Sequence, residues 1–162
     1  MGEKHSDLVN KSKAAFLKWR ALPAPERGNY IRLFGEALRE QKKEVANQIT
    51  SEAKKIISES EGEVQEVIDM CDFATGLSRQ LYGLTMPSER PNHRLQEIWQ
   101  PLGIVGCITA FNFPVAVFGW NFCLAAVCGN SIIWKPSPHS ERCAELTKKI
   151  WDSVASEYKD LS

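Results

Sequence analysis

An asparagine and a lysine stand at the ends of two apolar segments that the sequence predicts to be neighbouring strands. Asn112 follows the run from Ile104 to Ala110 and precedes Pro114, where a helix is expected to begin. A helix N-terminus carries unpaired backbone N–H groups and a partial positive charge, and an Asn side-chain amide adds another donor. Such a corner can stabilise a developing oxyanion. Spacing alone favours a simpler alternative, in which Asn112 is only an N-cap.

Lys135 ends the second apolar segment, which starts at Ser131, and Pro136 follows it. A lysine at the carboxyl end of a strand can reach the hydroxyl or phosphate groups of a ligand. The alternative is a surface lysine where the chain leaves the core. Gly103 and Gly106 are too few for a G-x-G-x-x-G fingerprint and open the strand instead of following it. They are interpreted as turn and packing residues.

These two residues depend on an alternation of strands and helices from Ile104 onward. The sequence predicts a strand over 104–110, a helix over 114–128, a strand over 131–135 and an amphipathic helix capped by Ser140. This order is typical of an α/β fold with a parallel sheet and right-handed crossovers, in which ligands bind beyond the carboxyl ends of the strands. Segments 109–112 and 135–137 should therefore lie side by side.

The first half of the chain predicts helices, the first of them capped by Asp7. Trp19, Phe34 and Phe73 follow helical spacing and are expected in the core. The glutamates of the segment 61–66 are interpreted as a solvated helix start. Residues 94–100 alternate imperfectly and predict a half-exposed strand. The chain thus divides into a helical region over 1–83, a turn and edge-strand connection over 84–102, and a strand–helix unit over 103–162.

Composition excludes several classes of protein. The chain has 162 residues with 20 Lys+Arg against 20 Asp+Glu, and this balance argues against a nucleic-acid partner. Its most apolar stretch, 111–127, is interrupted by polar residues and is too short for a membrane span. The start is polar, unlike a signal peptide. The five cysteines form no C-x-x-C pair and the three histidines are isolated, so we expect no metal site and a cytoplasmic location.

The segment Ile108-Thr109-Ala110-Phe111-Asn112-Phe113-Pro114, together with Trp134-Lys135-Pro136-Ser137, resembles the aldehyde dehydrogenase superfamily. The lead-in Pro101-Leu102-Gly103-Ile104-Val105-Gly106 is similar to that family as well. Segments 62–66, 76–79, 87–90 and 110–121 look like its antiquitin branch, which oxidises α-aminoadipic semialdehyde. The resemblance implies the aldehyde dehydrogenase fold, with N-terminal helices and part of a Rossmann-like, NAD-binding parallel sheet over 103–162.

The resemblance also implies roles for individual residues. Asn112 matches the asparagine whose amide supports the oxyanion of the thiohemiacetal intermediate, and this reverses the preference for a simple cap. Lys135 matches the lysine that binds the adenosine ribose of NAD. The remaining matches are NAD contacts at Thr109, Ala110 and Phe111, an aldehyde channel lined by Phe113 and Trp120, and Glu66 as the carboxylate that meets the amino group of the substrate.

Two departures from the family bear on activity. The family attacks the aldehyde with a cysteine thiolate and hydrolyses the thioester with a glutamate-activated water. No cysteine of this chain lies in the family's Gly-Gln-x-Cys setting, and the glutamate that acts as the family's general base, which follows the Trp-Lys-Pro strand at a distance, has no match in it either. We therefore expect this chain alone to be an inactive part of a homo-oligomeric NAD-dependent enzyme, and its uncovered sheet edge to favour self-association. The alternative is a non-catalytic, aldehyde dehydrogenase-like interaction module. A smaller departure is Lys54, which stands where the family usually has Gly.

Overall fold

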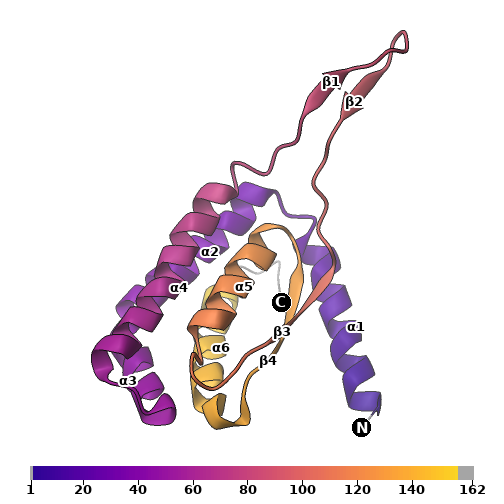
Figure 1. The fold of residues 1–162 in the computed structure, drawn as a ribbon. Coiled ribbons are helices and arrows are strands. Elements are labelled where there is room, and N and C mark those ends of the chain that lie inside the picture. The colour runs from indigo at the N-terminus through magenta and orange to yellow at the C-terminus, as the bar shows by residue number, and fades with distance from the viewer. Residues whose placement is uncertain (1, 157–162) are drawn as a thin grey trace.

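A computed structural model describes residues 2–156 of the 162-residue chain, so the predicted strand–helix unit extends past the described part at 157–162. Four helices come first, then a hairpin, then two parallel strands with a helix between them and another after them (Figure 1). The elements are α1 (Gly2–Trp19), α2 (Ala24–Glu40), α3 (Lys42–Ala53), α4 (Ile57–Leu77), β1 (Thr85–Pro87), β2 (Arg94–Gln96), β3 (Ile104–Ile108), α5 (Ala116–Val127), β4 (Ser131–Lys135), a 3₁₀ turn η1 (Pro138–Ser140) and α6 (Glu141–Ser156).

The strand–helix–strand unit has the predicted parallel arrangement. Strands β3 and β4 pair in register from Ile104 opposite Ser131 to Ile108 opposite Lys135. In Figure 1 these strands lie between α5 and α1, and both helices contact both strands. The α/β class and the parallel sheet expected from the alternation of apolar segments are therefore confirmed.

The core lies mainly among helices. Helix α4 packs along α2 on one side and along α5 on the other, while α6 contacts α2 and α3. Trp19 and Phe34 belong to this core, as predicted. Phe73 does not: 56% of it is exposed on α4, so the prediction from helical spacing was wrong at this position. Helical spacing identifies a face, but it does not show how wide the covered part of that face is.

The connection between the helices and the parallel strands is a projecting hairpin. Strands β1 and β2 pair antiparallel and stand away from the rest of the molecule (Figure 1). The predicted strand over 94–100 was too long, because β2 comprises only residues 94–96. All residues of both strands are exposed. With no layer packed on either face of the hairpin, the alternation of polar and apolar residues over 94–100 does not correspond to one buried and one solvated face.

One helix boundary differs from the prediction, and another is made by an unusual residue. Asp7 lies inside α1, which already begins at Gly2, and so it is not the N-cap. Helix α3 ends at Ala53, and the φ of 58° at its C-cap, Lys54, is in the left-handed region that favours glycine. Lys54 thus adopts the backbone conformation that explains the glycine expected at this position. A lysine is less favourable than a glycine in this conformation, but the backbone of the turn is the same.

The C-terminal end of α5 is held by side chains from the N-terminal helices. Arg27 on α2 donates from Nε to the carbonyl oxygen of Val127 at 3.0 Å, and Trp19 donates from Nε1 to that of Ala126 at 2.8 Å. A cation is favourable at this negative end of the helix. Burial lowers the pKa of Arg27. Arg27 thus satisfies a carbonyl group at the end of the helix, while the carbonyl of Ala126 accepts both from Trp19 and from the backbone N–H of Gly129.

Close packing of α4 against α5 depends on one glycine. A Cβ atom added at Gly119 would lie 2.5 Å from Cγ1 of Val67, well inside van der Waals contact. The two helices can therefore approach closely only because this position on α5 lacks a side chain.

We expect Gly119→Ala to destabilise the chain by about 1–3 kcal/mol through overpacking, reduced by a gain of about 1 kcal/mol in helix propensity. The matched control is Gly62→Ala on α4, where nothing lies within 4 Å of an added Cβ. The control should stabilise by about 0.5–1 kcal/mol. Urea unfolding curves of the three proteins measure both effects, and equal stability of the two variants would contradict the close approach.

Candidate functional site

The carboxyl ends of β3 and β4 form one edge of the molecule, as the sequence predicted. Ile108 pairs with Lys135 at the end of the parallel register. Beyond the strand, the backbone N–H of Thr109 donates to the carbonyl oxygen of Lys135 at 3.2 Å. The segments that carry Asn112 and Lys135 therefore leave the sheet side by side, and both side chains are exposed.

Thr109 joins the two strand ends through its side chain. Its hydroxyl accepts a hydrogen bond of 2.9 Å from Nε1 of Trp134 on β4. The Trp134 ring in turn stacks on Phe118 of α5, with the ring centroids 3.8 Å apart. Only 5% of Thr109 is exposed. Its hydroxyl is thus used inside the protein and its backbone N–H donates to Lys135, so what it can offer to a ligand is its backbone carbonyl.

The residues after Thr109 lie open at the same edge. Ala110, Phe111 and Asn112 are exposed in the bend between β3 and α5. Phe111 meets His139, from the turn after β4, edge to face with ring centroids 6.3 Å apart. This contact is a second link between the two loops at the edge, besides the backbone bond of Thr109.

A buried carboxylate holds the start of α5. Oε1 of Glu63, on α4, accepts hydrogen bonds from the backbone N–H groups of Val115 at 2.7 Å and Ala116 at 3.1 Å. Its Oε2 accepts from Nζ of Lys55 at 2.5 Å. The Glu63 side chain is fully buried and that of Lys55 is 12% exposed. The interpretation of Glu63 as part of a solvated helix start was therefore wrong.

The sequence does contain a signal for this burial. Glu63 lies four residues before Val67 and seven before Met70, on the same stripe of α4, and all three are buried. A charged residue on the apolar stripe of a helix needs a partner inside the protein. The glutamates were instead grouped by their proximity in the sequence, which hides the difference between Glu63 and its exposed neighbour Glu66.

Lys55 also contacts the turn that bears Asn112. Its Nζ lies 4.0 Å from the centroid of the Phe113 ring, a cation–π distance. Because Val115 and Ala116 already donate to Glu63, the expectation that α5 offers these two N–H groups to a ligand is corrected. The side-chain amide of Asn112 remains as a donor at this corner.

Glu66 and Trp120, two of the predicted substrate contacts, are brought together by α4 and α5. Nε1 of Trp120 donates to Oε2 of Glu66 at 3.4 Å, and both residues are exposed. Phe113 is exposed at the start of the same helix. Trp120 belongs to an uncovered apolar surface on α5 that also includes Val117 and Leu124, and Phe113 precedes it in the chain.

The start of α6 is held in the same way as that of α5. Glu52 on α3 accepts from the backbone N–H of Arg142 at 3.0 Å and from that of Cys143 at 2.8 Å. Ser140, the predicted cap, lies instead in the turn η1. Burial tends to raise the pKa of Glu52, but the hydrogen bonds from Cys143 and Arg142 outweigh it and the pKa is lowered. Burial, followed by the contact with Glu52, raises the pKa of the Cys143 thiol.

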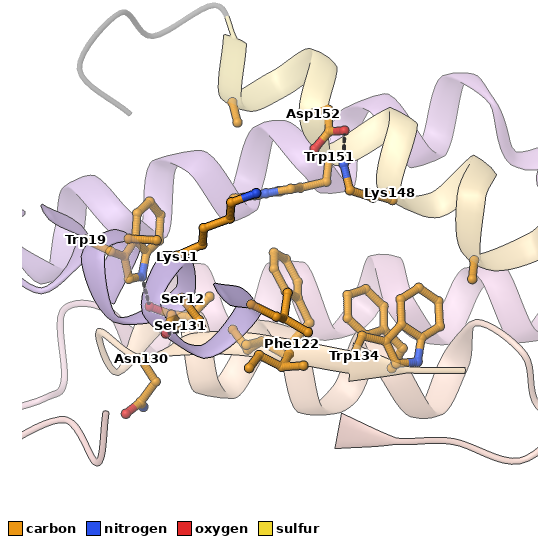
Figure 2. A pocket seen from close by; sticks show the side chains of 18 of the residues that line it. Lys11, Ser12, Trp19, Phe122, Asn130, Ser131, Trp134, Lys148, Trp151 and Asp152 are labelled. Atoms are coloured by element: carbon orange, nitrogen blue, oxygen red, sulfur yellow. Dashed lines mark hydrogen bonds and ion pairs between the residues drawn. The ribbon is translucent and has the colours of Figure 1, made fainter. Parts of the chain in front are cut away.

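A groove of about 750 Å³ lies along β4, away from these residues (Figure 2). Its walls are α1, where Ser12 bonds to Ser131 on β4 at 2.9 Å, and α6, where Lys148 pairs with Asp152. Residues 130–134 all line the groove. Since the side chains of a strand alternate between faces, this unbroken succession means that the edge of β4 faces the groove. Lys135 and Thr109 are outside the lining.

The described part of the chain also bears on metal and membrane chemistry. No helix within residues 2–156 combines the length and the apolar character needed to cross a membrane. Over the same residues, no three His, Cys, Asp or Glu side chains gather as a metal site would require. All five cysteines are free, and the Sγ atoms of Cys71 and Cys123 lie 3.6 Å apart in the core between α4 and α5.

Comparison with protein families identifies the family to which this chain belongs. The family model described as "Aldehyde dehydrogenase family" matches residues 2–157, nearly the whole chain. The chain belongs to the aldehyde dehydrogenase family. The resemblance inferred from the segments 108–114 and 134–137 is thereby confirmed.

Curated relatives point to the antiquitin branch. The chain is 54% identical over 136 residues to an aldehyde dehydrogenase family 7 member A1 of Malus domestica, covering 84% of this chain and 27% of the relative. It is 48% identical to a putative homolog of that protein in Dictyostelium discoideum, covering 96% and 30%. It is 45% identical to the α-aminoadipic semialdehyde dehydrogenase of Bos taurus, covering 96% and 29%. The chain thus spans about three tenths of the length of these relatives.

Solved structures confirm the fold. An aldehyde dehydrogenase of Brucella melitensis superposes with a TM-score of 0.91 at 25% identity, over 95% of this chain and 32% of that one. The lactaldehyde dehydrogenase of Escherichia coli superposes with a TM-score of 0.86 at 29% identity, over 90% and 31%. The described helices and strands therefore have the arrangement found in a part of complete aldehyde dehydrogenases.

The cap of α6 predicts a dependence of stability on pH. Because the pKa of Glu52 is lower in the folded chain than in the unfolded one, its stabilisation is present above the ordinary value of 4.5 and is lost as the pH falls through the folded pKa. We expect Glu52→Gln to cost about 1 kcal/mol at pH 7 and the difference from the parent to shrink below about pH 4. Urea unfolding across this range measures it. Glu145→Gln, on an exposed carboxylate of α6, is the control, and a pH-independent difference would contradict the cap.

Proposed function

We propose that this chain is the part of an NAD-dependent aldehyde dehydrogenase that supplies the oxyanion donor and one side of the cofactor site. The reaction is the oxidation of an aldehyde, α-aminoadipic semialdehyde or a similar semialdehyde, to the carboxylic acid. One observation carries the proposal: Asn112 and Lys135 are exposed at adjoining strand ends in a chain of the aldehyde dehydrogenase family. The similarity to α-aminoadipic semialdehyde dehydrogenases supports the substrate class.

Asn112 is the proposed catalytic residue of this part. When a thiolate adds to the aldehyde carbonyl, negative charge develops on the carbonyl oxygen, and a prealigned amide N–H stabilises it. Phe113 and Trp120 would line the path of the aldehyde. Glu66 would meet the amino group of the substrate in a charge-assisted pair, in place of the long hydrogen bond that it accepts from Trp120.

NAD, which accepts the hydride in this chemistry, fits the strand ends in part. The exposed ammonium of Lys135 suits the hydroxyl groups of the adenosine ribose. Ala110 and Phe111 are open to the same edge. Thr109 would contribute through its backbone carbonyl, because its hydroxyl accepts from Trp134 and its backbone N–H donates to Lys135. A pyrophosphate is commonly bound at a helix N-terminus. The first amides of α5 and α6 are already bound by carboxylates, so neither start is offered to the phosphates.

The chemistry also needs groups that this chain does not place at the site. None of its five cysteines is in the family's nucleophile setting, and four of the five are buried. Cys107, close to the strand end, has its pKa raised by burial, which suppresses the thiolate form. We therefore propose that the isolated chain does not turn over aldehyde.

The exposed edge of β4 and the uncovered face of α5 support a further proposal, that the isolated chain self-associates. An unpaired strand edge presents N–H and C=O groups to other chains, and an apolar patch favours burial. A non-catalytic interaction module would expose the same surfaces. Binding of NAD separates the two readings, because a module of that kind has no need of the cofactor.

For the isolated chain, we expect no NADH formation from NAD and α-aminoadipic semialdehyde, and weak NAD binding by titration calorimetry. Lys135→Ala should weaken that binding about tenfold or more, as the loss of a charged hydrogen-bond donor does. Lys149→Ala, on the exposed face of α6, is the matched control. Turnover by the purified chain would refute the inactivity, and NAD binding unaffected by Lys135→Ala would refute the assigned cofactor site.

The activity itself is tested in a chimaera in which this chain replaces the matching part of the Dictyostelium discoideum homolog, which aligns with 96% of it. We expect NADH formation with α-aminoadipic semialdehyde. Asn112→Ala should lower kcat about 10²–10³-fold, the usual cost of removing an oxyanion donor. Asn47→Ala, on an exposed position of α3, is the control. An Asn112→Ala chimaera with the kcat of the parent would rule out the oxyanion role.

A further inference from the structure

The turn that bears Asn112 is tied to α4 through a buried carboxylate. Asn112 and Phe113 are exposed, whereas Val115 and Ala116, two and three residues on from Phe113, are buried and donate to Glu63. The bond to Glu63 spans 52 residues of sequence at Val115. The position of the Asn112 amide is therefore set by a side chain of α4 as well as by the strand before it.

The charge of that anchor bears on the chemistry proposed for Asn112. A carboxylate suits the positive end of α5, but an uncompensated one would oppose a second negative charge on a neighbouring oxyanion. Lys55 removes this conflict, because its ammonium lies 2.5 Å from Oε2 of Glu63 and also stands over the Phe113 ring. Among the described residues, Lys55 is the cation paired with Glu63.

The place of Lys55 is itself fixed by the backbone. Lys54, the residue before it, closes α3 in a left-handed conformation and donates its backbone N–H to the carbonyl oxygen of Thr50 at 3.1 Å. This turn directs the chain from α3 toward α4, and Lys55 lies in the connection between them. The turn at Lys54 thus places the ammonium of Lys55 beside the buried carboxylate of Glu63.

We propose that Glu63 and Lys55 act together as a neutral positioning pair for the oxyanion donor. Glu63 holds the first amides of α5 and so orients the Asn112 turn, while Lys55 cancels the charge that would otherwise weaken the stabilisation of an anion there. The proposal deepens, and in its catalytic part rests on, the function proposed above. The positioning part concerns this chain alone.

The positioning part is tested by amide hydrogen exchange and by the side-chain amide resonance of Asn112 in the full 162-residue chain. In Glu63→Gln the amides of Val115 and Ala116 should exchange at least tenfold faster, and the Asn112 resonance should shift and broaden. Glu59→Gln, an exposed carboxylate in the first turn of α4, should change neither. Unchanged exchange and an unchanged Asn112 resonance in Glu63→Gln would overturn the proposal.

The electrostatic part is tested in the chimaera with three variants: Lys55→Met, Glu63→Gln and the double variant. Lys55→Met leaves the carboxylate unpaired, so kcat should fall at least tenfold with the KM for NAD unchanged. The double variant is neutral again, and its kcat should return to within threefold of Glu63→Gln alone. A purely structural pair predicts the opposite, a double variant no better than Lys55→Met, and that result would overturn the electrostatic role.

The two parts fail separately from the proposed function. If the parent chimaera forms no NADH, the proposed function fails, while exchange at Val115 and Ala116 still decides whether Glu63 positions the Asn112 turn. If the parent is active and the double variant is not improved, the function stands and the neutral-pair proposal falls.

Discussion

The carboxylate of Glu63, buried against the first amides of α5, is the interaction on which the arrangement of this chain depends. It joins the helical region to the strand–helix unit at the residues that follow β3. Arg27 and Trp19 hold the carbonyl groups at the other end of the same helix. Helix α5 is apolar and buried along one side, so its ends are where unpaired backbone groups would cost most. At both ends, side chains from the first 63 positions of the chain bind backbone groups of this helix.

Much of the edge at β3 and β4 could be predicted because it follows from local pattern. Two short apolar runs with a helix between them require parallel pairing, and parallel pairing brings Asn112 and Lys135 to one edge. The family could likewise be inferred from the segments at 108–114 and 134–137. The roles of Asn112, Lys135 and Glu66 remain proposals, because each role is a contact with a bound substrate or cofactor.

The features that the sequence pattern did not predict depend on contacts between residues that are distant in sequence. Glu63 and Glu52 each cap a helix that lies 52 or more residues farther on, and nothing near either glutamate indicates which helix it serves. Phe73 fails for the reverse reason, since its spacing is right but no element covers it. The hairpin at 85–96 projects with neither face packed against another layer. Alternation of polar and apolar residues therefore does not predict which of its side chains are buried.

The residues that cap α5 precede it in the sequence, and this order has a consequence for biosynthesis. Arg27 and Glu63 both precede α5, so the ribosome synthesises these two charged residues before the apolar helix whose ends they bind. When α5 emerges, α2 and α4 can already offer a surface and a partner for each of its ends. The most apolar helix of the described part thus leaves the ribosome after the residues that bind its two ends, so those partners are present in the chain from the moment it emerges.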